Sequence, residues 1–138
     1  MASFLLDTNV VSELSRRVPN SALLAQFEAQ RSSCGLAAIT VEELTFGVER
    51  MPPSARRNAL SAWLVGMIES LEHISYDSRC ATWLGRERAR LEEIGLSPSR
   101  PDGQIAAVAV TNNLTLVTRN TRDFARFSDL RVENWFEG

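Results

Sequence analysis

Three acidic side chains lie at positions from which they could share one catalytic site. Asp7 follows a short apolar run, Glu43 lies near the start of a helical segment, and Asp102 precedes an Ala- and Val-rich segment. Carboxylates about 5 Å apart repel by about 3 kcal/mol per pair at an effective dielectric constant near 20, so such a group requires a cation. Oxygen ligands favour Mg²⁺ or Mn²⁺ over zinc. These residues predict a magnesium-type site that activates water and stabilises charge on a phosphoryl group.

Each of these carboxylates also has a structural interpretation. Asp7 suits the N-cap of the helix that follows it, and Asp102 suits the N-cap of the apolar segment after it. Glu43 lies three residues after Thr40, the spacing of a capping box. Helical periodicity does not separate Glu43 from Glu42, because both lie off the apolar face of their helix. The residues alone leave both interpretations open at each position.

Short apolar runs alternate with helical periods along the chain. Strands are expected at residues 4–6, 34–37, 73–76, 114–118 and 130–133. Helices are expected near residues 10–17, at 22–29 after a Ser21 cap, from Thr40, at 54–71, at 78–94 and at 103–110. Residues 119–123 are expected to form a loop or short turn. This alternation predicts a mostly parallel sheet that is covered on both faces.

The polar residues are expected to meet at one edge of that sheet, because sites in parallel sheets lie beyond the carboxyl ends of the strands. Asp7 follows the first expected strand and Glu43 follows the second. Asn120 and Asp123 follow the fourth, while Asp102 opens the helix that precedes it. The expected sheet therefore supplies one location for all five side chains.

Length and composition set limits on the class of protein. The 138 residues are one domain's worth, so a single domain over residues 1–138 is expected. All 15 basic residues are arginine, which suits phosphate binding but also fits a simple codon preference. The absence of lysine excludes P-loop, Schiff-base and receiver-type chemistry. Apolar stretches are too short to span a bilayer and no signal peptide is evident, so a cytoplasmic protein is expected.

Other catalytic constellations find little support. Cys34 and Cys80 lie far apart and are expected to be buried thiols rather than a zinc or redox site. His73 is the single histidine, so a Ser-His-Asp or Cys-His arrangement has no partner set. An acid-phosphatase-like reaction with Asp7 as nucleophile would need a second Asp at Asn9 and a lysine that the chain lacks.

Four motifs in order resemble a PIN domain, and more narrowly the VapC/FitB-like toxins of bacterial type II toxin-antitoxin systems. The motifs are Leu5-Leu6-Asp7-Thr8-Asn9-Val10-Val11-Ser12-Glu13, Ala38-Ile39-Thr40-Val41-Glu42-Glu43-Leu44-Thr45-Phe46-Gly47, Pro101-Asp102-Gly103-Gln104-Ile105-Ala106-Ala107 and Val117-Thr118-Arg119-Asn120-Thr121-Arg122-Asp123-Phe124. The resemblance extends over essentially the whole chain. It implies a three-layer α/β/α sandwich around a short parallel sheet.

The resemblance also implies roles for individual residues. Asp7 matches the first metal-binding aspartate, Glu43 the glutamate before Leu-x-x-Gly, and Asp102 the aspartate before Ile-Ala-Ala, so Glu43 is favoured over its neighbour. Some relatives carry Asp where this chain has Asn120. Either Asp123 supplies the missing charge or the Asn120 amide acts through a water.

Four further residues are expected to assist at the site. The resemblance implies that Thr8 and Asn9 orient it. Arg119 and Arg122 are candidates to hold backbone phosphates, with an ordinary solvated surface as the alternative.

The resemblance implies an endoribonuclease toxin that uses Mg²⁺, for which Mn²⁺ is expected to substitute. A cognate antitoxin, an RNA substrate and a homodimer are the expected partners. The apolar face of the helix at 54–71, with Phe46 and Met51 nearby, is expected either to bind a partner or to cover the core. A PIN-fold module that binds RNA or antitoxin but cleaves weakly is the alternative, and Asn120 is the residue that favours it.

Overall fold

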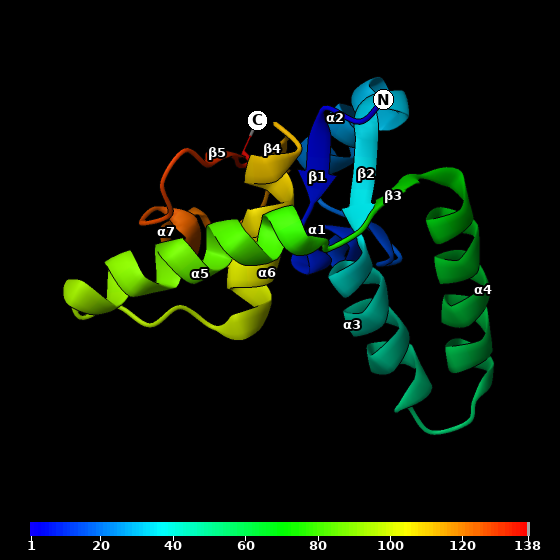
Figure 1. Ribbon diagram of the computed structural model, residues 1–138. Helices are drawn as coiled ribbons and strands as arrows, with labels where there is room; N and C mark the ends of the chain where they lie inside the picture. Colours follow the sequence, from blue (N-terminus) through cyan, green and yellow to red (C-terminus); the bar gives the residue numbers. More distant parts are fainter. Residues whose placement is uncertain (138) are drawn as a thin grey trace.

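A single parallel sheet forms the centre of the computed structural model, which describes residues 1–137 (Figure 1). Its strands are β1 (Phe4–Leu6), β2 (Cys34–Ala37), β3 (Glu72–Ile74), β4 (Thr115–Val117) and β5 (Arg131–Glu133). They lie in the order β3-β2-β1-β4-β5, and each neighbouring pair is parallel. The mostly parallel sheet predicted from the sequence is therefore confirmed.

Helices cover both faces of this sheet. They are α1 (Thr8–Leu14), α2 (Ser21–Gln30), the 3₁₀ turn η1 (Arg31–Ser33), α3 (Ala38–Glu49), α4 (Ala55–Ser70), α5 (Ser78–Glu93), α6 (Arg100–Thr111) and α7 (Thr121–Phe124). α3 and α4 pack side by side and extend together past the carboxyl end of β2 (Figure 1). None of the helices in residues 1–137 has the length and apolar character needed to cross a lipid bilayer.

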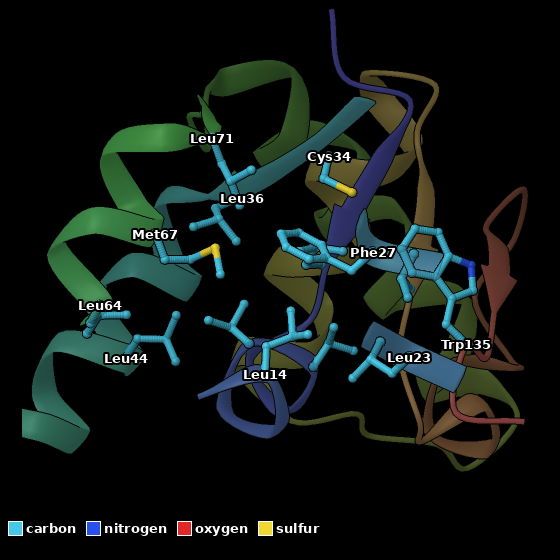
Figure 2. Packing of buried hydrophobic residues seen from close by; sticks show 14 of the residues in the cluster. Leu14, Leu23, Phe27, Cys34, Leu36, Leu44, Leu64, Met67, Leu71 and Trp135 are labelled. Carbon is cyan, nitrogen blue, oxygen red and sulfur yellow. The ribbon is translucent and has the colours of Figure 1, made fainter. Parts of the chain in front are cut away.

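The two faces of the sheet bury two separate cores, because neighbouring strand residues point in opposite directions. Leu6 and Leu36 pack on the face covered by α1 to α4, where Figure 2 shows Leu36 in one cluster with Leu44 and Met67. Leu5 packs on the other face, against α5 and α6. The three-layer α/β/α sandwich is therefore confirmed.

Several helices begin earlier than expected. α3 begins at Ala38 rather than Thr40, because β2 runs directly into it through Ala37, whose side chain makes no capping bond. Thr40 is buried inside the first turn and its hydroxyl has no hydrogen-bond partner, so the predicted capping box is wrong. Asn20 rather than Ser21 caps α2.

The segments around the third and fourth motifs also differ from expectation. Ser99 caps α6, so Asp102 lies inside the first turn and is not the N-cap. Residues 121–124 form the short helix α7 instead of a loop.

The position of β1 fixes where a site can form. From β1 the chain adds β2 and β3 on one side, then crosses to add β4 and β5 on the other. The connections thus diverge at the carboxyl ends of β1 and β4. Open α/β sheets bind their ligands at this kind of crevice.

Candidate active site

Asp7 lies in the crevice between β1 and β4 and is held by both. Its backbone N–H donates to the Val117 carbonyl at 3.0 Å. Its Oδ1 accepts from the Thr8 N–H at 2.8 Å, and its Oδ2 accepts from the Thr118 hydroxyl at 2.8 Å. Asp7 is therefore the N-cap of α1 and, at the same time, a buried carboxylate fixed at the centre of the crevice.

Thr8 links Asp7 to the next carboxylate along the crevice. Its hydroxyl donates to Glu43 Oε1 at 2.7 Å, across the gap between α1 and α3. Glu43 is half-buried, whereas Glu42 is exposed and turned away. The structure thus places Glu43 next to Asp7, which helical periodicity alone did not decide.

Asp102 joins the same group from the first turn of α6, on the other side of β1. It is half-buried. Burial raises the pKa of Asp102; a hydrogen bond with Ser99 lowers it, and the charges of Asp123 and Glu43 raise it. Burial likewise raises the pKa of Asp7, more than the hydrogen bonds from Thr118 and Thr8 lower it, and the charges of Asp102 and Glu43 add to the rise. Carboxylates from four elements therefore repel one another across this crevice.

The donor set fits a hard divalent cation in its chemistry. It consists of oxygen atoms, and a positive ion would offset both the burial and the smaller carboxylate repulsion that raise the pKa values of Asp7 and Asp102. Among residues 1–137, no three His, Cys, Asp or Glu side chains stand close enough together to form a ready metal cluster. An ion shared by three of these carboxylates would therefore have to draw them closer together than they stand.

Thr118 is a site residue that the sequence analysis missed. Its hydroxyl donates to Asp7 and accepts from the Asn120 backbone N–H at 3.0 Å. The signal that could have revealed it is its position directly after β4, which matches the position of Asp7 after β1.

The two candidates for the fourth position lie on different sides of the site. Asn120 is exposed and lines a groove that also contains Glu43. Asp123 is exposed on α7, where its charge acts on Asp102.

That groove extends from the carboxylates between α1, α3 and α4 and has a volume of about 680 Å³. Asn9 and Arg119 line it, as do Arg56 and Trp63, which the sequence analysis did not single out. Arg122 is exposed on α7, outside the described lining of this groove.

The thiols and the histidine lie apart from this arrangement. Cys34 and Cys80 are free and buried, and burial raises the pKa of Cys34 to about 11. The His73 ring is within hydrogen-bond distance of the Ile68 carbonyl at 2.6 Å.

Comparison with known proteins gives the family of this fold and site. The PIN domain family model matches residues 4–130. The chain belongs to the PIN-domain family. This PIN domain is 31% identical to the tRNA(fMet)-specific endonuclease VapC of Shigella flexneri, over 98% of this chain and 99% of that protein. It is 34% identical to the toxin FitB of Neisseria gonorrhoeae, over 87% of this chain and 89% of that protein.

Solved structures give the same relationship. The DNA-bound VapBC of Salmonella typhimurium matches with a TM-score of 0.87 and 32% identity, over 98% of this chain and 99% of that chain. The FitAcB structure from Neisseria gonorrhoeae also matches with a TM-score of 0.87, at 31% identity over 98% and 99% of the two chains. The resemblance of this PIN domain to the VapC/FitB-like toxins is therefore confirmed.

Proposed function

We propose that this PIN domain is the toxin of a type II toxin-antitoxin system and acts as an endoribonuclease that requires Mg²⁺ or Mn²⁺. The proposal rests on the cluster of carboxylate side chains near the carboxyl ends of β1 and β4. Asp7 is fixed there by Thr8 and Thr118, with Glu43 and Asp102 in the same electrostatic field. Relatives over nearly the full chain are named ribonuclease or endonuclease VapC.

Asp7, Glu43 and Asp102 would hold the ion. When bound, the ion would supply activation of water and stabilisation of charge at the phosphorus. Thr8 fixes Glu43 through Oε1, which leaves Oε2 as the oxygen that would accept a proton. The Thr8 N–H and the Thr118 hydroxyl would hold the Asp7 carboxylate in position for the ion. Arg119 would bind the phosphodiester backbone beside them.

We expect Asp7→Asn and Asp102→Asn each to reduce RNA cleavage by about 100-fold or more, because each removes a charge that holds the ion. Purified protein is incubated with total RNA in Mg²⁺ or in EDTA, and the products are followed on a gel. Asp129→Asn is the matched control, since Asp129 lies in a turn with a φ of 62°, a conformation that Asn tolerates. Cleavage by either site variant at the parental rate would overturn the proposal.

A module that binds RNA or antitoxin but cleaves weakly is a second candidate. Two features favour it. By the family resemblance, Asn120 supplies an amide where some relatives carry an aspartate, and within residues 1–137 no three carboxylates form a ready cluster. Calorimetric titration with Mn²⁺ at neutral pH distinguishes the two candidates. The nuclease requires that the protein bind Mn²⁺, and the binding module does not.

An antitoxin and a second copy of the chain are the proposed protein partners. Several solved relatives are VapBC or FitAB complexes. Most of the apolar face of α4 packs inward, with Leu64 and Met67 buried, so core packing accounts for it. Phe46 on α3 and Val65 on α4 remain 62% and 52% exposed and are the proposed contact residues. Size-exclusion chromatography at several concentrations tests the homodimer, and a monomer throughout would exclude it.

A further inference from the structure

The groove beside the carboxylates carries arginines from three separate elements. It begins at Glu43 and Asn120 and extends between α1, α3 and α4. Arg16 at the end of α1, Arg56 on α4 and Arg119 after β4 all line it. A groove that starts at a phosphodiester-cleaving site and is walled by arginines is suited to an anionic polymer.

Glu13, one of the two acidic residues that line the groove, is paired with a cation of the same groove. Glu13 accepts from the Asn20 backbone N–H at 2.9 Å and from Arg16 at 3.2 Å. The Asn20 hydrogen bond is the main reason that the pKa of Glu13 lies below its usual value. Glu13 thus accepts a hydrogen bond from Arg16 and also interacts through its charge with Arg119. Arg56 and Arg119 are the lining cations that form no hydrogen bond with Glu13, so a phosphate would compete with Glu13 only for the charge of Arg119.

Arg119 is held in a defined orientation. Its guanidinium lies over the Phe136 ring, 4.6 Å from the ring centroid. Phe136 is buried in the core, so the ring is a fixed support. Stacking uses the flat face of a guanidinium, and the N–H groups at its edge stay available for phosphate oxygens.

An aromatic side chain completes the groove. Trp63 is half-buried on α4, packed against the core and also lining the groove. Arg56, Leu60 and Trp63 are spaced i, i+4 and i+7, so they share one face of α4. An aromatic surface next to ordered arginines is how proteins bind unpaired nucleotides, with the base stacked and the phosphate paired.

We propose that this groove is a nucleotide subsite, in which Arg119 binds a backbone phosphate next to the cleaved bond and Trp63 stacks on the adjoining base. The inference rests on the proposed function, because the ligand is taken to be RNA. Phe46 and Val65, the large apolar side chains exposed on α3 and α4, lie outside the groove. Apolar side chains such as Val11, Leu44 and Leu64 also line the groove, so the arginines, and not a lack of apolar surface, are the reason for choosing RNA over a protein segment as the occupant.

Binding of a fluorescein-labelled 12-nucleotide single-stranded RNA, measured by anisotropy in EDTA, tests the subsite without cleavage. We expect Trp63→Leu to weaken binding about tenfold and Trp63→Phe, which keeps an aromatic ring, by less than about threefold. Arg119→Gln is expected to weaken RNA binding about tenfold. It is also expected to reduce the slope of log K against log salt concentration by about one, the value for one lost phosphate contact. Arg126→Gln, an exposed arginine outside the groove, is the control.

The outcomes separate the subsite from the nuclease. Parental protein that binds with this dependence on Trp63 and Arg119 but cleaves no RNA would refute the proposed function and keep the subsite. Parental protein that fails to bind the RNA, or variants that bind it as the parent does, would overturn the subsite. A third result would also overturn the subsite: Trp63→Leu weakens binding of a co-expressed antitoxin but leaves RNA binding unchanged. The groove would then be a protein-binding surface.

Discussion

The Thr118 side chain links the centre of the site to the second half of the chain through a hydrogen bond to Asp7. It donates to the buried carboxylate of Asp7 and accepts from the Asn120 backbone. A buried carboxylate that loses one of two donors keeps its desolvation cost without the bond that offset it.

We therefore expect Thr118→Val to lower the free energy of unfolding by about 1–3 kcal/mol and to reduce RNA cleavage at least tenfold. Urea denaturation and the gel assay measure the two effects. Thr118→Ser keeps the hydroxyl and is expected to stay close to the parent in both. Equal losses in the two variants would show that packing, and not the hydrogen bond to Asp7, is responsible.

Single residues differed in how well the sequence could place them. Asp7 and Asp102 were predictable because each stands at the junction of an apolar strand or helix with a polar motif. Helical periodicity could not separate Glu43 from Glu42; the family resemblance favoured Glu43, and the fold places it against Thr8 through a hydrogen bond across α1 and α3. Thr118 was missed because a lone threonine after a strand carries no charge to mark it.

A buried carboxylate also joins α5 to the segment between α7 and β5. Glu87 is 6% exposed, pairs with Arg90, and accepts from the Ser128 backbone N–H at 2.7 Å. Arg90 in turn donates to the Arg126 carbonyl at 2.7 Å. The segment before β5 is thus hydrogen-bonded to α5 through two charged side chains, Glu87 and Arg90.

This tie predicts a pH dependence of stability. The hydrogen bond from Arg90 holds the pKa of Glu87 below its usual value. A carboxyl group with a lowered folded-state pKa stabilises the fold above its unfolded pKa, and that stability is lost as the pH falls through the folded value. We expect Glu87→Gln to cost about 1–3 kcal/mol at pH 7 and much less at pH 3.

Urea denaturation at the two pH values measures the difference. Glu93→Gln, on the exposed end of α5, is the control and is expected to change little at either pH. A Glu87→Gln cost that is the same at pH 3 and pH 7 would contradict the electrostatic explanation.

The elements themselves were largely predictable, apart from their first turns. Strand positions and helix order followed from the apolar runs, because buried parallel strands and amphipathic helices have distinct periods. The start of α3 did not, because the backbone turns from Ala37 directly into a helix with no side-chain cap. Thr40 has the residue type and the spacing to Glu43 that are typical of a helix cap, but it is buried in the core.

The proposed metal requirement is a property of the whole molecule, since the proposed ligands come from the end of β1, from α3 and from α6. Binding of an ion to the folded state alone raises stability by RT ln(1 + [ion]/Kd), about 2.7 kcal/mol at 100 times Kd. We expect saturating Mg²⁺ to raise the melting temperature of the parent by several degrees, and by clearly less in Asp102→Asn. Thermal unfolding followed by circular dichroism, with matched NaCl as the ionic-strength control, measures this. An equal rise in both proteins would indicate a site elsewhere.

The pairing of β1 with β4 also sets a time at which the proposed toxicity can begin. Asp7 leaves the ribosome early, but its partner Thr118 is translated 111 residues later. A nascent chain that has not yet exposed β4 has no second wall for the crevice and no donor for Asp7 Oδ2. The proposed nuclease would therefore stay inert until the chain through β4 has been synthesised.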